Sequence, residues 1–426
     1  MYRQIGGALA LLACCSTDAV AAGRGPPAIG HIIVIYLENH SFDNLYGLFP
    51  GSEGIARAAP ENVLQEDADG TVYRHLPRTD SRFPADLPNA PFDIGRFVPP
   101  DQKIPDLVHR FEENQLQING GRMNRFVAYS NRKGLAMGYY DGRDLPLWQY
   151  ARRYTLADHF FQAAFGGSYL NHQWLICGCT PRFERAPLPL IENGSVTADG
   201  YAVNTVQPAA GPHLPQTPQA QLMPPLELPT IGDRLSAAGV NWAWYAGGWN
   251  DAVAGHAAPN FQFHHQPFAY YRRYAGTEEG RRHLKDEADF VRAIDDGSLP
   301  PVSFYKPIGD LNEHPGYADV LSGERHIARL LQRIEASPVF RDALVIVTYD
   351  ENGGFWDHVP PPAGDRWGPG PRVPAIIVSP FARRGHVDHT VYDTTSILTL
   401  IEHRYGLAPL GERDARANDP AQALVR

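Results

Sequence analysis

The chain has 426 residues, a formal net charge of −9 at pH 7 and 43% hydrophobic residues. An acidic chain without runs of Lys or Arg argues against a nucleic-acid-binding protein and against a surface built for anionic lipids. The length and the many glycines and prolines favour one large α/β core with long irregular excursions.

The first residues have the three parts of a secretory signal peptide. Arg3 supplies a short positive region, an apolar core too short to span a bilayer follows, and Ala19–Ala21 is a small-residue cleavage site. The sequence therefore predicts a signal peptide over residues 1–21 and an exported protein, periplasmic or extracellular. A lipid anchor at Cys14 and a buried N-terminal helix are the alternatives, and no other segment is long and apolar enough to insert stably into a membrane.

Apolar segments with little alternation predict strands that are buried on both faces, at residues 31–39, 240–247, 344–352 and 373–381. Such strands are typical of a parallel sheet covered by helices. Helical patterns lie at residues 228–239, 322–340 and 394–407. This alternation predicts βαβ units and an α/β fold. Residues 50–105 and 181–225 are rich in Pro and Gly, which predicts long loops or a cap on the core.

Cys177 and Cys179 are the cysteines that remain once a signal peptide is removed. Two residues apart on a predicted helix, their side chains would point to different faces. The sequence therefore predicts buried thiols and no disulfide.

Acidic and amide side chains end two of the predicted strands. Glu38 and Asn39 end the first, and Asp350-Glu351-Asn352 end the strand at 344–352. Ligands of open α/β sheets bind at the carboxyl ends of strands, and clustered carboxylate and amide oxygens suit Mg²⁺, Ca²⁺ or Mn²⁺. Two such strand ends favour a metal site over the alternative, in which each acid caps the following helix.

Ser168 follows two glycines and precedes a helical pattern in FGGSYLNHQWLICG, residues 165–178. The glycines permit a tight turn with close approach of a ligand, and a helix N-terminus favours an anion. On this stretch alone a helix cap is the simpler interpretation, and a metal-activated nucleophile is the alternative.

Several histidines lie in loops rich in Pro or Gly, where binding residues concentrate: His109, His264, His265, His314 and His358. Each taken alone is typical of a surface or hydrogen-bonded histidine.

Five motifs together resemble the bacterial phosphoesterase family, which includes secreted acid phosphatases and phosphatidylcholine-preferring phospholipases C. They are ENHSFDNLYG (38–47), FGGSYLNHQWLICG (165–178), EHPGYADVLSGE (313–324), TYDENGGFWDHVPPP (348–362) and GPGPRVPAIIVSPFAR (368–383). The resemblance runs from residue 30 to about residue 405. It implies an alkaline-phosphatase-like three-layer α/β core with a mostly parallel sheet, and a single phosphoesterase domain over residues 22–426.

The resemblance also implies roles for individual residues. It places the ligands of one divalent metal ion, Mg²⁺, Ca²⁺ or Zn²⁺, on Glu38, Asn39, Ser168, Asp350 and Glu351. It makes Ser168 the nucleophile, and it places the histidines that contact phosphate on His109, His314 and His265, with the choice of His265 over His264 left open. His314 is expected to protonate the leaving alcohol.

The sequence therefore predicts a secreted acid phosphatase that hydrolyses small phosphate monoesters through a phosphoserine. The Gly-Gly-Ser loop is closer to the phosphatases, because phospholipase members usually have Gly-Pro before a threonine. Cationic histidines near their ordinary pKa of about 6.5 would give an acid pH optimum. A phospholipase C and a non-catalytic secreted metal-binding protein are the alternatives, and the sequence carries no signal for oligomeric state.

Overall fold

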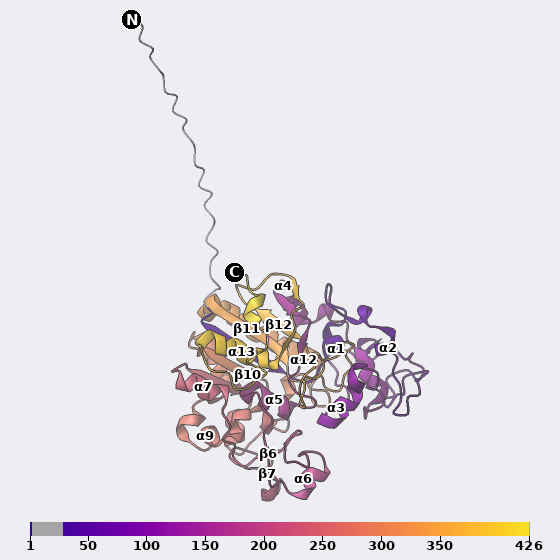
Figure 1. The fold of residues 1–426 in the computed structure, drawn as a ribbon, viewed down its shortest axis with the longest axis horizontal. Helices are drawn as coiled ribbons and strands as arrows, with labels where there is room; N and C mark the ends of the chain where they lie inside the picture. The colour runs from indigo at the N-terminus through magenta and orange to yellow at the C-terminus, as the bar shows by residue number, and fades with distance from the viewer. Residues whose placement is uncertain (2–28, 426) are drawn as a thin grey trace.

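An eight-stranded sheet forms the centre of the computed structural model, which describes residue 1 and residues 29–425 (Figure 1). The signal peptide and the Cys14 anchor lie outside the described residues. Across the sheet the strands are β13 (His386–Asp388), β4 (Thr155–Ala157), β12 (Ala375–Val378), β11 (Ala343–Tyr349), β1 (His31–Leu37), β10 (Val302–Lys306), β8 (Trp242–Ala246) and β9 (Leu284–Asp286). The predicted α/β fold with a mostly parallel sheet is confirmed.

Strand β12 is the exception to the parallel order, because it runs antiparallel to β11 and β4. Residues 350–374, all described, contain no helix, so β11 and β12 are not joined by a βαβ crossover. An apolar strand has the same pattern in both directions, and the sequence alone therefore did not reveal the reversal.

Helices cover both faces of the sheet. The side chain of Tyr36 on β1 points to one face of the sheet. There its hydroxyl donates to the backbone carbonyl of Asn171 on α5 (Ser168–Cys177). Its neighbour Ile35 pairs with Tyr305 on β10, so Tyr305 points to the opposite face. There the Tyr305 hydroxyl lies 2.7 Å from His326 of α12 (Val320–Ala336). The two helices therefore lie on opposite sides of the sheet.

Each face carries a group of helices that pack against one another. The α5 side includes α7 (Ile231–Ala237) and α13 (Thr394–Tyr405), and the α12 side includes α4 (Pro146–Arg153) and α11 (Glu287–Asp295). Residues 50–105 and 181–225 contain only short elements, among them α2 (Pro60–Val63) and α6 (Leu188–Glu192). Among the described residues, no helix combines the length and the apolar character needed to cross a bilayer.

Cys177 and Cys179 form a disulfide, which corrects the prediction of free thiols. Helix α5 ends at Cys177, so Cys179 lies beyond the helix and the chain can turn its side chain back. The helical-face argument failed because it placed both residues inside one helix.

A buried carboxyl on α12 gives a first testable prediction. Glu324 is fully buried, its Oε2 accepts the backbone N–H of Leu147, and burial raises the pKa of Glu324 to about 8. An unfolded chain releases this proton near pH 4.3. Between those values the folded state holds more protons, so the free energy of unfolding should fall as pH rises from 5 to 8. Glu324→Gln keeps the accepting oxygen without a charge and should be more stable than the wild type at pH 8, by roughly 2–4 kcal/mol.

Denaturant unfolding at pH 5 and pH 8 measures this effect. Glu412→Gln is the control, because the Glu412 side chain is 89% exposed. Equal pH dependence in the wild type and in Glu324→Gln would contradict the assignment.

Candidate active site

The carboxyl ends of three central strands place charged side chains on the face covered by α5. Leu37 pairs with Tyr349, so Glu38 and Asp350 follow at neighbouring positions one step beyond the pairing. Alternation along each strand points Glu38, Asp350 and the last residue of β10, Lys306, to the side of Tyr36. The acids at the ends of β1 and β11 thus lie together, although they are far apart in sequence.

Asn39 turns the chain sharply at the end of β1. Its φ of 65° lies in the left-handed region, which asparagine tolerates better than most residues. The loop after Asp350 passes so close that a Cβ on Gly353 would lie 2.1 Å from the Asn39 carbonyl oxygen. Only glycine fits at that crossing. The Gly353 N–H also donates to Glu351 Oε2 at 2.6 Å, which fixes the Glu351 carboxylate near Asn39.

Ser168 is the first residue of α5, and Gly167 is the N-cap. The Ser168 hydroxyl does not cap the helix. It lies 3.3 Å from Glu38 Oε2 and 3.3 Å from Asn39 Oδ1. Asn171 shapes the loop before it, because its amide donates to the Ala164 and Gly166 carbonyls. The geometry therefore favours the alternative in which Ser168 faces the acidic strand ends.

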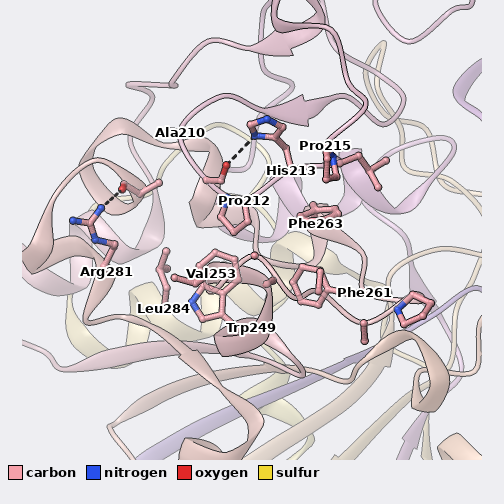
Figure 2. A pocket seen from close by; sticks show the side chains of 18 residues that line it. Ala210, Pro212, His213, Pro215, Trp249, Val253, Phe261, Phe263, Arg281 and Leu284 are labelled. Carbon is pink, nitrogen blue, oxygen red and sulfur yellow. Dashed lines mark hydrogen bonds between the residues drawn. The ribbon is translucent and has the colours of Figure 1, made fainter.

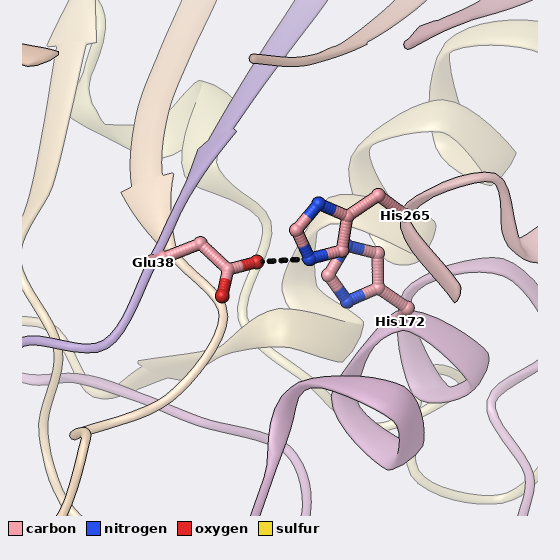
Figure 3. Close-up of side chains that lie close together, drawn as sticks. All are labelled: Glu38, His172 and His265. Atoms are coloured by element: carbon pink, nitrogen blue, oxygen red, sulfur yellow. Dashed lines mark ion pairs between the residues drawn. The ribbon is translucent and has the colours of Figure 1, made fainter. Parts of the chain in front are cut away.

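His265 reaches the same carboxylate from the turn at Phe263–His265. Its Nε2 lies 2.7 Å from Glu38 Oε1, whereas the neighbouring His264 is buried beside it without that contact. Figure 3 shows the ring of His265 stacked on His172, with centroids 5.3 Å apart. His172 Nδ1 is in turn 2.7 Å from the Ser168 carbonyl oxygen. Of the two adjacent histidines, the structure brings His265 to the site.

His109 and His314 lie on the more open side of the cluster. Their Nδ1 atoms are each 2.6 Å from a backbone carbonyl oxygen, of Leu107 and Pro315 respectively. His109 Nε2 lies 3.4 Å from the side-chain amide nitrogen of Asn39. His109 Nε2 is 3.8 Å from Glu351 Oε1. The rings of His109 and His314 meet edge to face, with their centroids 5.5 Å apart. The predicted histidines therefore border the space above the carboxylates.

His358 does not join this cluster. Its Nδ1 lies 2.6 Å from Asp43 Oδ2, inside a buried network around Arg372. Arg372 donates to Asp357 and Asp43, and it ties together three of the motifs that the sequence singled out.

Burial and mutual repulsion shift the carboxyl groups of the site in different directions. Burial and the nearby Glu38 charge raise the pKa of Asp350 to about 7, and burial and Asp350 raise the pKa of Glu351 well above its usual value. Burial would also raise the pKa of Glu38, but His265 and Lys306 lower it well below the usual value. Burial lowers the pKa of His265 to about 4, so Lys306 is the neighbour that keeps Glu38 ionised at neutral pH.

The histidine pKa shifts also change the expected pH dependence. Burial lowers the pKa of both His265 and His314. Their cationic forms therefore predominate only at more acid pH than the ordinary value of about 6.5 on which the sequence prediction relied.

The oxygen atoms at the strand ends are of the type that divalent cations prefer. Asp350 Oδ2 and Glu351 Oε1 are buried and have no hydrogen-bond partner among the described residues, and the Lys306 ammonium is 3.6 Å from Asp350 Oδ2. Unpaired buried carboxylate oxygens are costly unless a cation lies beside them. Asn39 Oδ1 and the Ser168 hydroxyl add neutral oxygen donors close to Glu38. These residues would hold Mg²⁺, Ca²⁺ or Zn²⁺.

The sequence reasoning missed Lys306 altogether and left the role of His172 open. Lys306 Nζ lies 2.5 Å from Glu38 Oε1 and 3.6 Å from Asp350 Oδ2, and all three side chains are fully buried. One signal was available, because a lysine ends the apolar run VSFYK in a chain with few lysines. His172 gave no comparable signal, since its position one turn after Ser168 matters only once α5 is placed.

A separate cavity of about 700 Å³ lies beside the turn that carries His265 (Figure 2). Trp249, Phe261 and Phe263 line it together with residues of the 210–215 segment. None of the predicted catalytic or metal-binding residues lines this cavity, so it is distinct from the carboxylate cluster.

Comparison with known proteins places this chain in a family. A model of the phosphoesterase family matches residues 29–408. Non-hemolytic phospholipase C of Pseudomonas aeruginosa is 25% identical over 420 residues, which cover 89% of this chain and 54% of that protein. Phospholipase C B of Mycobacterium tuberculosis is 27% identical over 434 residues, covering 91% of this chain and 76% of that protein. The chain thus spans about half the length of the Pseudomonas relative.

A solved structure gives a weaker likeness. A protein of the alkaline phosphatase superfamily from Vibrio parahaemolyticus is 12% identical and covers 67% of this chain and 66% of its own, with a TM-score of 0.38. A likeness at this level supports no conclusion about the site.

Proposed function

Because the chain belongs to the phosphoesterase family, we propose that it is a hydrolase of phosphoric esters that uses Ser168 as its nucleophile. The observation that carries the proposal is the position of the Ser168 hydroxyl, 3.3 Å from both Glu38 Oε2 and Asn39 Oδ1. A hydroxyl held among buried carboxylates, with histidines around the opening, is an arrangement for nucleophilic phosphoryl transfer.

Phospholipids of the phosphatidylcholine type are the proposed substrates. The curated relatives described above are phospholipases C, which supports this choice over the acid phosphatase that the sequence favoured. A phosphate monoesterase remains the second candidate, because the Gly166-Gly167-Ser168 loop resembles the phosphatase members of the family.

In the first step the Ser168 oxygen attacks phosphorus and the bond from phosphorus to the lipid alcohol breaks. Glu38 Oε2 is placed to accept the serine proton. His109 and His265 are placed to contact the phosphoryl oxygens, where charge develops in the transition state. The cationic form of His314, with Nδ1 held by the Pro315 carbonyl, gives the proton on Nε2 to the leaving oxygen, so the alcohol departs neutral.

In the second step water attacks the phosphorus bound to Ser168. His314, now without its proton, can take one from that water, and the serine oxygen leaves with a proton returned from Glu38. The products are the alcohol, phosphocholine and the restored hydroxyl.

A divalent cation at Glu38, Asn39, Asp350 and Glu351 would favour the ionised serine and offset the charge of the phosphoryl group. Three carboxylates, the Lys306 ammonium and one divalent ion give a neutral site, which supports a single metal ion.

Parallel assays on two substrates test the proposal. The purified protein is supplied with Mg²⁺, Ca²⁺ or Zn²⁺ and given phosphatidylcholine vesicles or p-nitrophenyl phosphate. We expect kcat/KM for phosphocholine release to exceed that for the monoester by at least about 10-fold. Preference for the monoester would support the second candidate. Hydrolysis of neither substrate with any of the three metals would overturn the proposal in favour of a non-catalytic metal-binding protein.

A further inference from the structure

Three side chains of types that can bind metal ions meet after β13 and β4, the two strands at one edge of the sheet, which carry none of the predicted active-site residues. Strands β13 and β4 run parallel, with Asp388 paired to Ala157. The residues that follow these two strands are therefore neighbours. They are Asp158 and His159 after β4, and His389 after β13.

The donor atoms of these side chains converge closely. Asp158 is fully buried, and its Oδ1 lies 2.8 Å from His159 Nδ1 and 3.0 Å from His389 Nδ1. All three donors lie within 4.8 Å of one another. Tetrahedral Zn²⁺ with bonds of about 2.0–2.1 Å holds its ligand atoms roughly 3.3 Å apart. The three side chains thus already have nearly the spacing that one ion requires.

The surroundings leave room for a fourth ligand. The side chain of His389 is 60% exposed, so water can reach the cluster. Glu53, which is half-exposed, supports the cluster from behind: its Oε2 lies 3.3 Å from His159 Nε2, the ring nitrogen opposite the one that faces Asp158, and its backbone N–H donates to Asp158 Oδ2 at 2.7 Å. Two imidazoles with one carboxylate and an open position suit Zn²⁺ better than Mg²⁺ or Ca²⁺, which prefer oxygen ligands.

We propose that Asp158, His159 and His389 bind a Zn²⁺ ion separate from the catalytic metal. The ion would join the start of the segment that leads to Ser168 to the segment that precedes α13. These two segments also pair as the short parallel strands β5 (Phe160–Phe161) and β14 (Tyr392–Asp393). The site is therefore structural, and its proposal does not depend on the reaction proposed for Ser168.

Zinc binding to the purified full chain tests the proposal. The protein is stripped of metal with a chelator, equilibrated with low-micromolar Zn²⁺ alone and desalted, and its zinc content is measured. His389→Ala should retain about one zinc equivalent fewer than the wild type, because it removes a ligand of this site only. His386→Ala is the matched control, since it removes the histidine that begins β13, three residues before His389, and is not part of the cluster.

The melting temperature gives a second readout that needs no activity. Zn²⁺ should raise the melting temperature of the wild type and of His386→Ala more than that of His389→Ala. Any zinc bound at the proposed catalytic site is common to the wild type and both variants, so its effect on the melting temperature cancels in the comparison. Equal zinc content and an equal thermal response in His389→Ala and in the wild type would overturn the proposal and leave a hydrogen-bonded Asp–His cluster without metal.

Discussion

Replacing Ser168 with alanine should lower phosphoester hydrolysis by roughly 10³–10⁶-fold. The substitution removes the only oxygen of that side chain, and therefore the attacking atom, without leaving a large cavity. The kcat/KM of Ser168→Ala and of the wild type on the better of the two substrates measures the effect. Ser303→Ala is the matched control, because Ser303 is also a buried serine but lies on β10 within the sheet.

A direct search for the covalent intermediate accompanies this comparison. Acid-quenched wild-type protein should carry a phosphoryl adduct on the peptide that contains Ser168, and Ser168→Ala should carry none. Hydrolysis by Ser168→Ala at the rate of the Ser303→Ala control would exclude Ser168 as the nucleophile.

Replacing Lys306 with methionine should destabilise the metal-free protein by about 3–5 kcal/mol, because removing one partner of a buried ion pair leaves the other charge uncompensated. Glu38 Oε1 is 2.5 Å from the ammonium, and Asp350 Oδ2 is 3.6 Å away. A divalent cation at the strand ends supplies positive charge close to the same carboxylates. The loss of stability should therefore be smaller when the protein is loaded with metal.

Denaturant unfolding with and without metal measures both effects. Lys285→Met serves as the control, because Lys285 is a half-buried lysine on the edge strand β9. If Lys306→Met were as stable as Lys285→Met without metal, Lys306 would not be the counter-charge of Glu38.

The sequence predicted the central strands from their long apolar runs, and it predicted the candidate site from the acidic residues that end two of these runs. Glu38 and Asp350 each follow such a run, and the rule that ligands bind at the carboxyl ends of the strands was enough to expect them at one edge of the sheet. The parallel pairing of β1 with β11 then places them side by side. Lys306 escaped notice because β10 has only five residues, and its partner Glu38 is far away in the chain. The register between β1 and β10 decides the contact of Lys306 with Glu38, and no local sequence pattern encodes that register.

Local conformation also decides details that the sequence left open or missed. The choice of His265 over His264 stayed open because the two residues are adjacent, and only the conformation of their short turn decides which of them faces Glu38. Cys179 lies just past the end of α5, and helix ends are the part of a sequence prediction most easily misplaced.

The attachment of Glu38 and Asp350 to the two central strands has a consequence for motion. The Asp350 amide donates to the Leu37 carbonyl and so continues the ladder between β11 and β1, and the Glu38 amide donates to the carbonyl of Asn312 in the loop after β10. Amide exchange with solvent at these two positions should therefore be about as slow as in the middle of β1, with or without metal. Moving these two residues would require breaking backbone hydrogen bonds at the carboxyl edge of the sheet, so in the proposed reaction the histidine loops, and not the carboxylates, are the parts free to adjust as substrate enters.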